Sequence, residues 1–332
     1  MRSSDILLFE RLEVEANEVR GKAVPYSPNR DFPFKAPLMK GTTDPGSGNL
    51  PRMSEWQIGF AVYLSGRRSF LIGKTTGVYR VKGGGYEDGP ILDDENGTRE
   101  LTGGQLKKIA MRELEANDRI NRILEGYGFL VAAEPAGYFD YEGFPCTAGV
   151  YMVSAETRMD ELLRKISMFD QKNHLDTLQR NAVRDMLDGM GRYMGSLLAL
   201  LHENQLCWGS DIYTDLRNAH IGNFVVGFES RNSLFVGMVD FDHYLLASCL
   251  GIAGPRITRK HLKEVQEYER KRIKTDIETP SFFSMWGDPI PFLPSLNKCL
   301  GGMAVAFDRG YETMDSKPVQ LDISLLEQLR TV

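Results

Sequence analysis

Residues 201–244 read LHENQLCWGSDIYTDLRNAHIGNFVVGFESRNSLFVGMVDFDHY. Within them, the HIGN motif that ends at Asn223 leads into an apolar run, and the DFD motif that begins at Asp240 follows another. Taken singly, these motifs are typical of a turn and of a strand that ends in solvated carboxylates. Together, an amide oxygen and a carboxylate at the ends of two adjacent strands could hold Mg²⁺ against nucleotide phosphates, because this hard cation prefers oxygen ligands.

This arrangement resembles the protein-kinase-like superfamily, including the small-molecule kinases related to aminoglycoside phosphotransferases. In that superfamily the catalytic loop ends in a metal-binding asparagine, and a strand then leads to a DFG- or DFD-type aspartate. The resemblance implies that Asn223 and Asp240 are the metal ligands and that the cofactors are ATP and Mg²⁺. Leu201-His202, at the end of a long apolar helix, also looks like the LH of the superfamily, although it could be simply a helix end.

The same superfamily requires a strand lysine on the α- and β-phosphates and a helix glutamate that holds this lysine. Lys82 closes a β-type run, and Glu113 lies four residues after Ile109 on the apolar stripe of a helix predicted over 105–125. A carboxylate that faces inward needs a partner, and Lys82 is the candidate, whereas Glu115 lies off the stripe. The alternative is a solvated Lys82 at a strand end and Glu113 at the edge of a surface face.

Three glycines, Gly83 to Gly85, directly follow the lysine, whereas a typical kinase has its glycine loop between the first two strands. The KGGG run with Arg112-Glu113 downstream is similar to the selenoprotein O family, and that resemblance implies protein adenylyltransferases on a kinase-like fold. Backbone amides of Gly83 and Gly84 could cradle phosphate, and a plain flexible hairpin is the alternative.

Two further sites follow from the kinase resemblance. Met152 and Val153 end a β-type segment before a helix, so the resemblance implies a hinge whose backbone contacts adenine. Gly73 and Gly77 would flank the turn between two strands that could cover a nucleotide.

The catalytic base departs from the superfamily pattern. The base aspartate should stand five residues before Asn223, but this position is Asn218, and an amide does not accept a proton as a carboxylate does. An inserted bulge could bring Asp215 into the base position, so Asp215 is the predicted base, with local closure of the loop as its alternative role. The function therefore stays open between a phosphotransferase acting on a hydroxyl, a protein adenylyltransferase, and an inactive pseudokinase that regulates or acts as a scaffold.

The predicted fold is α+β, a two-lobed protein-kinase-like arrangement with nucleotide and Mg²⁺ in the cleft between the lobes. Its parts are an extended N-terminal arm over 1–56, a β-rich nucleotide-binding lobe over 57–153 and a helical catalytic lobe over 154–332. The pattern predicts strands at 60–64, 69–72, 78–82, 129–133, 149–153, 224–228 and 234–241, and helices at about 105–125, 158–169 and 175–203.

Composition limits the binding partners and the cellular compartment that we expect for this protein. With 40 Lys+Arg against 45 Asp+Glu, the net charge of −5 argues against a sequence-independent grip on nucleic acid. The basic run at 256–274 is interrupted by acids, which is typical of a solvated helix face; a phosphorylated or nucleic-acid substrate is the alternative. The four scattered cysteines and the absence of a run of about 20 apolar residues indicate a cytoplasmic protein without a membrane span. The expected substrate is a hydroxyl-bearing small molecule or protein.

Overall fold

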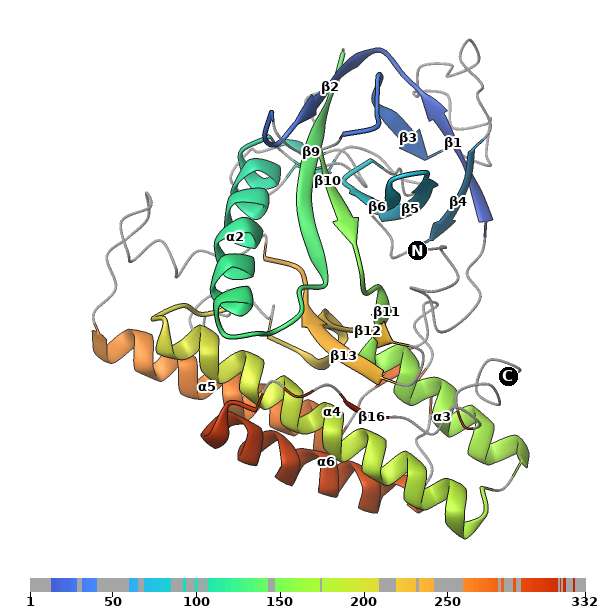
Figure 1. Cartoon of the computed structure of the whole chain (residues 1–332), viewed down its shortest axis with the longest axis vertical. Coiled ribbons are helices and arrows are strands. Elements are labelled where there is room, and N and C mark those ends of the chain that lie inside the picture. The colour runs from blue at the N-terminus through green and yellow to red at the C-terminus, as the bar shows by residue number, and fades with distance from the viewer. Residues whose placement is uncertain are drawn as a thin grey trace. The chain divides into compact units, whose positions relative to one another are not determined.

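The structure is a computed structural model, and the chain in it divides into two compact units (Figure 1). Unit 1 is drawn from Glu10–Asp118 and Ala133–Ser154, and unit 2 from Arg119–Ala132 and Ala155–Val332, each with a short N-terminal piece. The structure describes residues 13–28, 32–40, 60–64, 69–84, 92–93, 99–100, 105, 107–142, 147–173, 175–208, 219–230, 233–241, 259–279, 282–283, 289–290, 294–315, 317, 319–320 and 325. A β-rich unit and a mainly helical unit confirm the predicted α+β class.

Unit 1 is built on an eight-stranded antiparallel sheet with the order β2-β9-β10-β6-β5-β4-β1-β3 (Figure 1). Its strands are β1 (Glu13–Glu18), β2 (Gly21–Pro25), β3 (Leu38–Lys40), β4 (Phe60–Leu64), β5 (Ser69–Lys74), β6 (Gly77–Lys82), β9 (Ala133–Tyr141) and β10 (Thr147–Val153). The strands predicted at 60–64, 69–72, 78–82 and 149–153 are confirmed, because alternating or continuous runs of apolar residues favour strands.

The N-terminal residues that the sequence presented as an arm supply three strands of this sheet, β1 to β3. Phe34 is buried and meets the rings of Tyr79 and Phe139 edge to face, each with centroids 5.3 Å apart. Leu38 and Met39 are buried in the same cluster. The described part of 1–56 therefore contributes to the core of unit 1.

Strand β9 corrects one prediction, because the strand expected at 129–133 instead runs over Ala133–Tyr141. The sequence pattern did not predict this strand, because Pro135 and Gly137 are both disfavoured in the interior of a strand. Pro135 is paired with Tyr151 where the β9–β10 register shifts, and the β2 ladder reaches only to Gly137. A proline is tolerated at such a bulge because no ladder hydrogen bond is required of it.

The helices predicted at about 105–125, 158–169 and 175–203 are confirmed. They are α2 (Lys107–Gly126), α3 (Met159–Asn173), α4 (Thr177–Glu203), α5 (Arg259–Glu278) and α6 (Pro294–Thr313). Helix α4 begins at a capping box in which the Asp176 side chain accepts from the Gln179 amide and the Gln179 side chain accepts from the Asp176 amide. Among the described residues, no helix has both the length and the apolar character needed to cross a bilayer.

Unit 2 combines α3 to α6 with a four-stranded antiparallel sheet, β11-β12-β13-β16. These strands are β11 (Thr157–Arg158), β12 (Phe224–Ser230), β13 (Ser233–Met238) and β16 (Val319–Gln320), and the 3₁₀ turn η1 (Ile221–Asn223) precedes β12. Two short hairpins form separate sheets: β7 (Leu92–Asp93) with β8 (Arg99–Glu100), and β14 (Phe282–Phe283) with β15 (Pro289–Ile290). Glycines set the distance between α4 and α6, which lie side by side (Figure 1). A Cβ at Gly195 would lie 1.9 Å from the carbonyl oxygen of Phe307, so only glycine fits there.

Candidate functional site

In unit 1 the structure brings Lys82 and Glu113 together. Lys82 is the last residue of β6 and Glu113 lies on α2, and Nζ is 3.0 Å from Oε1. Their side chains are only 12% and 1% exposed. The carboxylate that the helical stripe placed inward therefore has the partner that such a buried charge requires.

Gln105 completes this pair, and sequence reasoning did not identify it. Its Nε2 donates to Glu113 Oε2 at 3.1 Å, so both carboxylate oxygens accept a hydrogen bond. The backbone of Gln105 is fixed in turn, because the Thr147 amide donates to its carbonyl at 2.8 Å. No local sequence pattern identifies such a residue, since its backbone is held by Thr147, which lies on a distant strand.

The two described glycines after Lys82 have packing reasons of their own. Gly83 has a φ of +88°, which favours glycine, and a Cβ there would lie 3.0 Å from the carbonyl oxygen of Thr147. A Cβ at Gly84 would lie 2.7 Å from the Tyr141 hydroxyl. Gly85 is outside the described residues. Close packing alone therefore accounts for Gly83 and Gly84, and their amides remain proposed phosphate ligands.

The turn between Gly73 and Gly77 joins two strands, as the sequence predicted. In the β5–β6 ladder Lys74 pairs with Gly77, whereas Ser69 pairs with Lys82. The turn therefore lies at the opposite end of the ladder from Lys82, about 16 Å away at 3.3 Å per residue. At the lysine end of the ladder, β4 ends and β5 begins.

Met152 and Val153 close strand β10, where the sequence predicted an adenine hinge. Met152 is paired with Tyr79 and is 36% exposed, and Val153 is buried. Unit 1 ends one residue later, at Ser154. These residues thus stand where the chain passes from one compact unit to the next.

In unit 2 the structure places Asn223 and Asp240 at the same end of the β12–β13 hairpin. Phe224 pairs with Met238, and the Val239 amide donates to the Asn223 carbonyl at 3.1 Å. Asp240 follows immediately, with a φ of +71° that is uncommon for a residue other than glycine. Such a conformation persists only where the surroundings hold it, and it is most frequent at functional sites.

Trp208 holds the backbone beside Asp240. Its Nε1 donates to the Val239 carbonyl at 3.0 Å, and its ring, fully buried, lies against Phe224 and Phe241 with centroids 4.8 Å and 6.2 Å apart. The Trp208 amide donates to Glu269 Oε2 at 3.0 Å. A buried residue of α5 is therefore connected through one tryptophan to the segment that carries Asp240.

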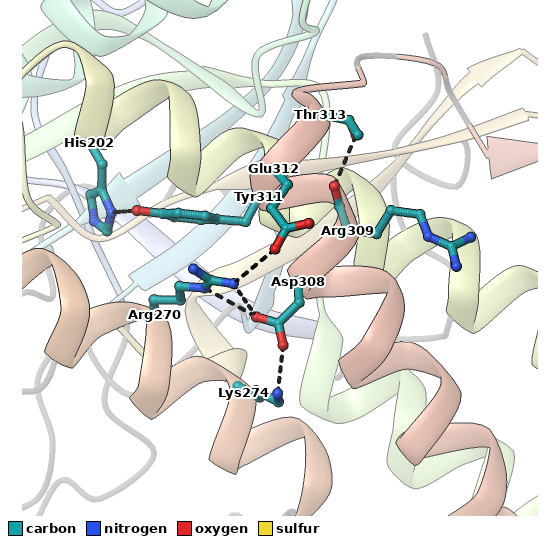
Figure 2. A network of polar contacts seen from close by, with 8 residues as sticks. All are labelled: His202, Arg270, Lys274, Asp308, Arg309, Tyr311, Glu312 and Thr313. Atoms are coloured by element: carbon teal, nitrogen blue, oxygen red, sulfur yellow. Dashed lines mark hydrogen bonds and ion pairs between the residues drawn. The ribbon is translucent and has the colours of Figure 1, made fainter.

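His202, from the LH that resembled the superfamily, belongs to the same network. Its Nε2 lies 3.0 Å from Glu269 Oε2, and its Nδ1 lies 2.8 Å from the Tyr311 hydroxyl, as Figure 2 shows for the second contact. The side chains of His202 and Glu269 are 4% and 0% exposed. His202 is thus a buried link between α4, α5 and α6.

The basic run on α5 is partly neutralised within unit 2. Arg270 donates to Asp308 Oδ1 through Nε and Nη2 at 3.1 Å and 2.8 Å, and Lys274 lies 2.5 Å from Oδ2 (Figure 2). Arg270 also stacks 4.5 Å from the centre of the Tyr311 ring. These two cations bind the protein itself, which weighs against their use as nucleic-acid contacts.

The sequence analysis did not identify Arg158 as a site residue, but its side chain contacts the predicted metal ligand Asn223. Its Nη1 donates to the Asn223 side-chain oxygen at 2.6 Å and to the Gly222 carbonyl at 2.8 Å. Among the described residues, no group of three or more His, Cys, Asp or Glu side chains is arranged to hold a metal ion. Asp240 offers a carboxylate suited to Mg²⁺, but the oxygen of Asn223 is already bound by a cation, so these residues fit a metal only in part.

Comparison with solved structures finds kinases at low similarity. A glucosamine kinase is 13% identical over 78% of this chain and 69% of its own, with a TM-score of 0.34. A rhoptry kinase from Toxoplasma gondii is 12% identical over 97% of this chain and 83% of its own, also with a TM-score of 0.34. Values this low decide neither the fold nor the activity. No protein-family model and no curated protein sequence matches the chain.

The predicted base cannot be placed, because Asp215 and Asn218 lie outside the described residues. The described chain resumes at Ala219 and reaches Asn223 through His220, which caps η1. The Nδ1 of His220 accepts from the Gly222 amide at 3.1 Å. Burial lowers the pKa of His220 below its usual value of 6.5, and the charge of Arg158 lowers it further.

Because the folded protein disfavours the charged form of His220, its stability should fall as the pH drops below about 6.5, where the unfolded chain takes up the proton first. The variant His220→Asn keeps an acceptor at the cap but does not titrate. We expect its unfolding free energy to decline less between pH 7 and pH 5, measured by urea denaturation. Asp276, whose pKa burial raises and the charge of His220 lowers, is present in both proteins, so the comparison reports the titration of His220 together with its effect on Asp276. Equal declines would show that His220 is not held neutral.

Proposed function

We propose that this protein is an ATP-dependent phosphotransferase of the kinase-like type that transfers the γ-phosphoryl group to a hydroxyl of a small molecule or protein. The buried Lys82–Glu113 pair carries this proposal. A buried ion pair often stabilises a protein no better than apolar residues of similar volume, because both charges lose hydration. A lysine held at 3.0 Å by a carboxylate that a second donor also fixes is therefore better explained as a prepared phosphate ligand.

The other residues take roles that the superfamily resemblance suggests. Lys82 would bind the α- and β-phosphates with Glu113 orienting it, and amides of Gly83 and Gly84 would contact phosphate. Backbone groups of Met152 and Val153 would contact adenine, Asn223 and Asp240 would bind Mg²⁺, and Asp215 would orient or deprotonate the acceptor. Mg²⁺, when bound, would neutralise charge on the phosphates.

Adenylyl transfer is the second candidate, and the KGGG run together with Asn218 favours it. It needs the triphosphate held in the opposite sense, so that the α-phosphate meets the acceptor. A nucleotide-binding pseudokinase is the third, and the contact of Arg158 with Asn223 favours it. The cytoplasm suits all three, and the two described cysteines, Cys207 and Cys299, are both free thiols.

Asp240→Asn is expected to reduce label transfer from ATP by at least about a hundredfold, since it removes the carboxylate that is the predicted metal ligand. Asparagine is the right replacement because it tolerates positive φ, whereas alanine at +71° would add backbone strain. The purified protein is incubated with Mg²⁺, cell extract and ATP labelled at either the γ- or the α-phosphate, and label on protein and small molecules is counted.

Asp185→Asn is the matched control, because this carboxylate on α4 is 72% exposed and the charge change is the same. Transfer of γ-label that requires Asp240 supports the phosphotransferase, and transfer of α-label supports the adenylyltransferase. Transfer that is unchanged in Asp240→Asn contradicts both catalytic proposals. ATP binding measured by calorimetry without any transfer would favour the pseudokinase.

A further inference from the structure

Arg158 is the last residue of strand β11. Its backbone pairs with Val225 of β12, two residues beyond Asn223. From this position both protons of Nη1 are used, one on the Asn223 side-chain oxygen and one on the Gly222 carbonyl. The guanidinium therefore sits against the turn η1 through a bidentate set of hydrogen bonds, and a 2.6 Å contact from a cation to an amide oxygen is a strong one.

This contact competes with metal binding at Asn223. The amide oxygen would have to turn from Arg158 toward the metal, and a divalent cation on that oxygen would stand close to a fixed positive charge. Arginine does not relieve this repulsion by losing its proton, because its pKa lies far above physiological pH. The guanidinium thus supplies at Asn223 a positive charge that a divalent cation would otherwise supply.

The N–H groups of Arg158 that do not contact η1 indicate which kind of ligand this charge could bind. A guanidinium has five N–H groups, of which Nη1 uses two, and its Nε and Nη2 have no hydrogen-bond acceptor among the described residues. The two atoms form the fork that matches a pair of phosphate oxygens. Asp240, the other predicted metal ligand, lies at the same end of the β12–β13 hairpin.

We infer that Arg158 replaces a divalent cation at Asn223 and binds a phosphate group of the nucleotide directly, so that nucleotide binding does not require metal. This inference rests on the proposed function for the identity of the ligand. It assigns Arg158 as a phosphate-binding residue, it takes from Asn223 the Mg²⁺-binding role that the superfamily resemblance suggests, and it limits metal at this turn to Asp240.

The first experiment tests the competition without nucleotide. Mn²⁺ is titrated into the full chain and the free ion is followed by electron paramagnetic resonance. We expect Arg158→Gln to bind Mn²⁺ about tenfold more tightly than the unchanged protein, because one neighbouring positive charge is removed, and we expect Arg158→Gln/Asn223→Ala to lose this gain. Equal Mn²⁺ affinity in Arg158→Gln and the unchanged protein would overturn the replacement.

The second experiment tests the phosphate contact, with ATP titrated calorimetrically in EDTA and in Mg²⁺. The unchanged protein should bind ATP in both buffers, and Arg158→Gln should weaken binding in EDTA by about tenfold or more, as expected for a lost charge-assisted hydrogen bond. Arg158→Lys keeps the positive charge but loses the forked pair of donors, so its ATP affinity in EDTA should lie between those of the unchanged protein and Arg158→Gln. Binding that requires Mg²⁺ in the unchanged protein would overturn the inference.

Arg164→Gln on α3 is the matched control, since the charge change is the same and Arg164 donates to the sulfur of Met168 on its own helix. Melting temperatures of all variants show whether each is folded. Failure of the unchanged protein to bind ATP in either buffer would overturn the proposed function together with the phosphate contact. The Mn²⁺ comparison decides separately whether Arg158 blocks Asn223.

Discussion

Replacing Glu269 by alanine is expected to lower the free energy of unfolding by about 3–5 kcal/mol. The carboxylate is fully buried, and one oxygen, Oε2, serves both His202 Nε2 and the Trp208 amide. Alanine would leave both of these buried nitrogens without their acceptor and would open a cavity between α4 and α5. Urea denaturation at neutral pH measures the loss.

Two comparisons sharpen this prediction. Glu269→Gln keeps an acceptor oxygen, so its loss should be smaller, about 1–2 kcal/mol. Glu267→Ala, on the exposed face of the same helix, should change stability by no more than about 0.5 kcal/mol. A loss in Glu269→Ala no larger than that in Glu267→Ala would show that the buried network does not hold the helices together.

The Glu269 network has a consequence for the site. Trp208 takes its position from Glu269 at its amide and gives a hydrogen bond to Val239 at its indole. Asp240 is the next residue, and its positive φ needs a firmly held neighbour. Stability in this part of unit 2 and the geometry of the predicted metal ligand therefore depend on the same buried contacts.

The second large effect is expected for Lys82→Met, with a loss of about 3 kcal/mol in stability and loss of label transfer from ATP. Removing the lysine takes the ammonium group away from the Glu113 carboxylate, which is 1% exposed and still accepts a hydrogen bond from Gln105. Thermal and urea unfolding measure the stability change, and the γ- and α-label assays measure transfer.

The double variant Lys82→Met/Glu113→Leu separates stability from function. Apolar residues of similar volume often replace a buried ion pair without loss, so stability should return to within about 1 kcal/mol while transfer stays absent. Lys107→Met is the control, because this lysine is 57% exposed and its pair with Asp140 should contribute less than about 1 kcal/mol. Transfer retained by the double variant would remove Lys82 and Glu113 from the proposed machinery.

Local patterns in the sequence determined most of the secondary structure. The strands at β4, β5, β6, β10 and β12 and the helices α2, α3 and α4 follow from apolar spacing, which depends only on neighbours along the chain. The same spacing placed Glu113 on the inward stripe of α2, and the need of a buried carboxylate for a partner pointed to Lys82. The HIGN and DFD motifs likewise flanked a hairpin, so their approach required only adjacent strands.

Tertiary structure alone decided the rest. Strand β9 exists despite Pro135 because a bulge and a missing ladder partner make the proline harmless. Gln105 reaches Glu113 from outside the described helix, and Arg158 reaches Asn223 across 65 residues of chain. Contacts of this kind depend on how sheets and helices bring distant residues together. The spacing of neighbouring residues along the chain does not predict them. The sequence therefore predicted a set of candidate groups, and the fold decided that a guanidinium lies against one of them, Asn223.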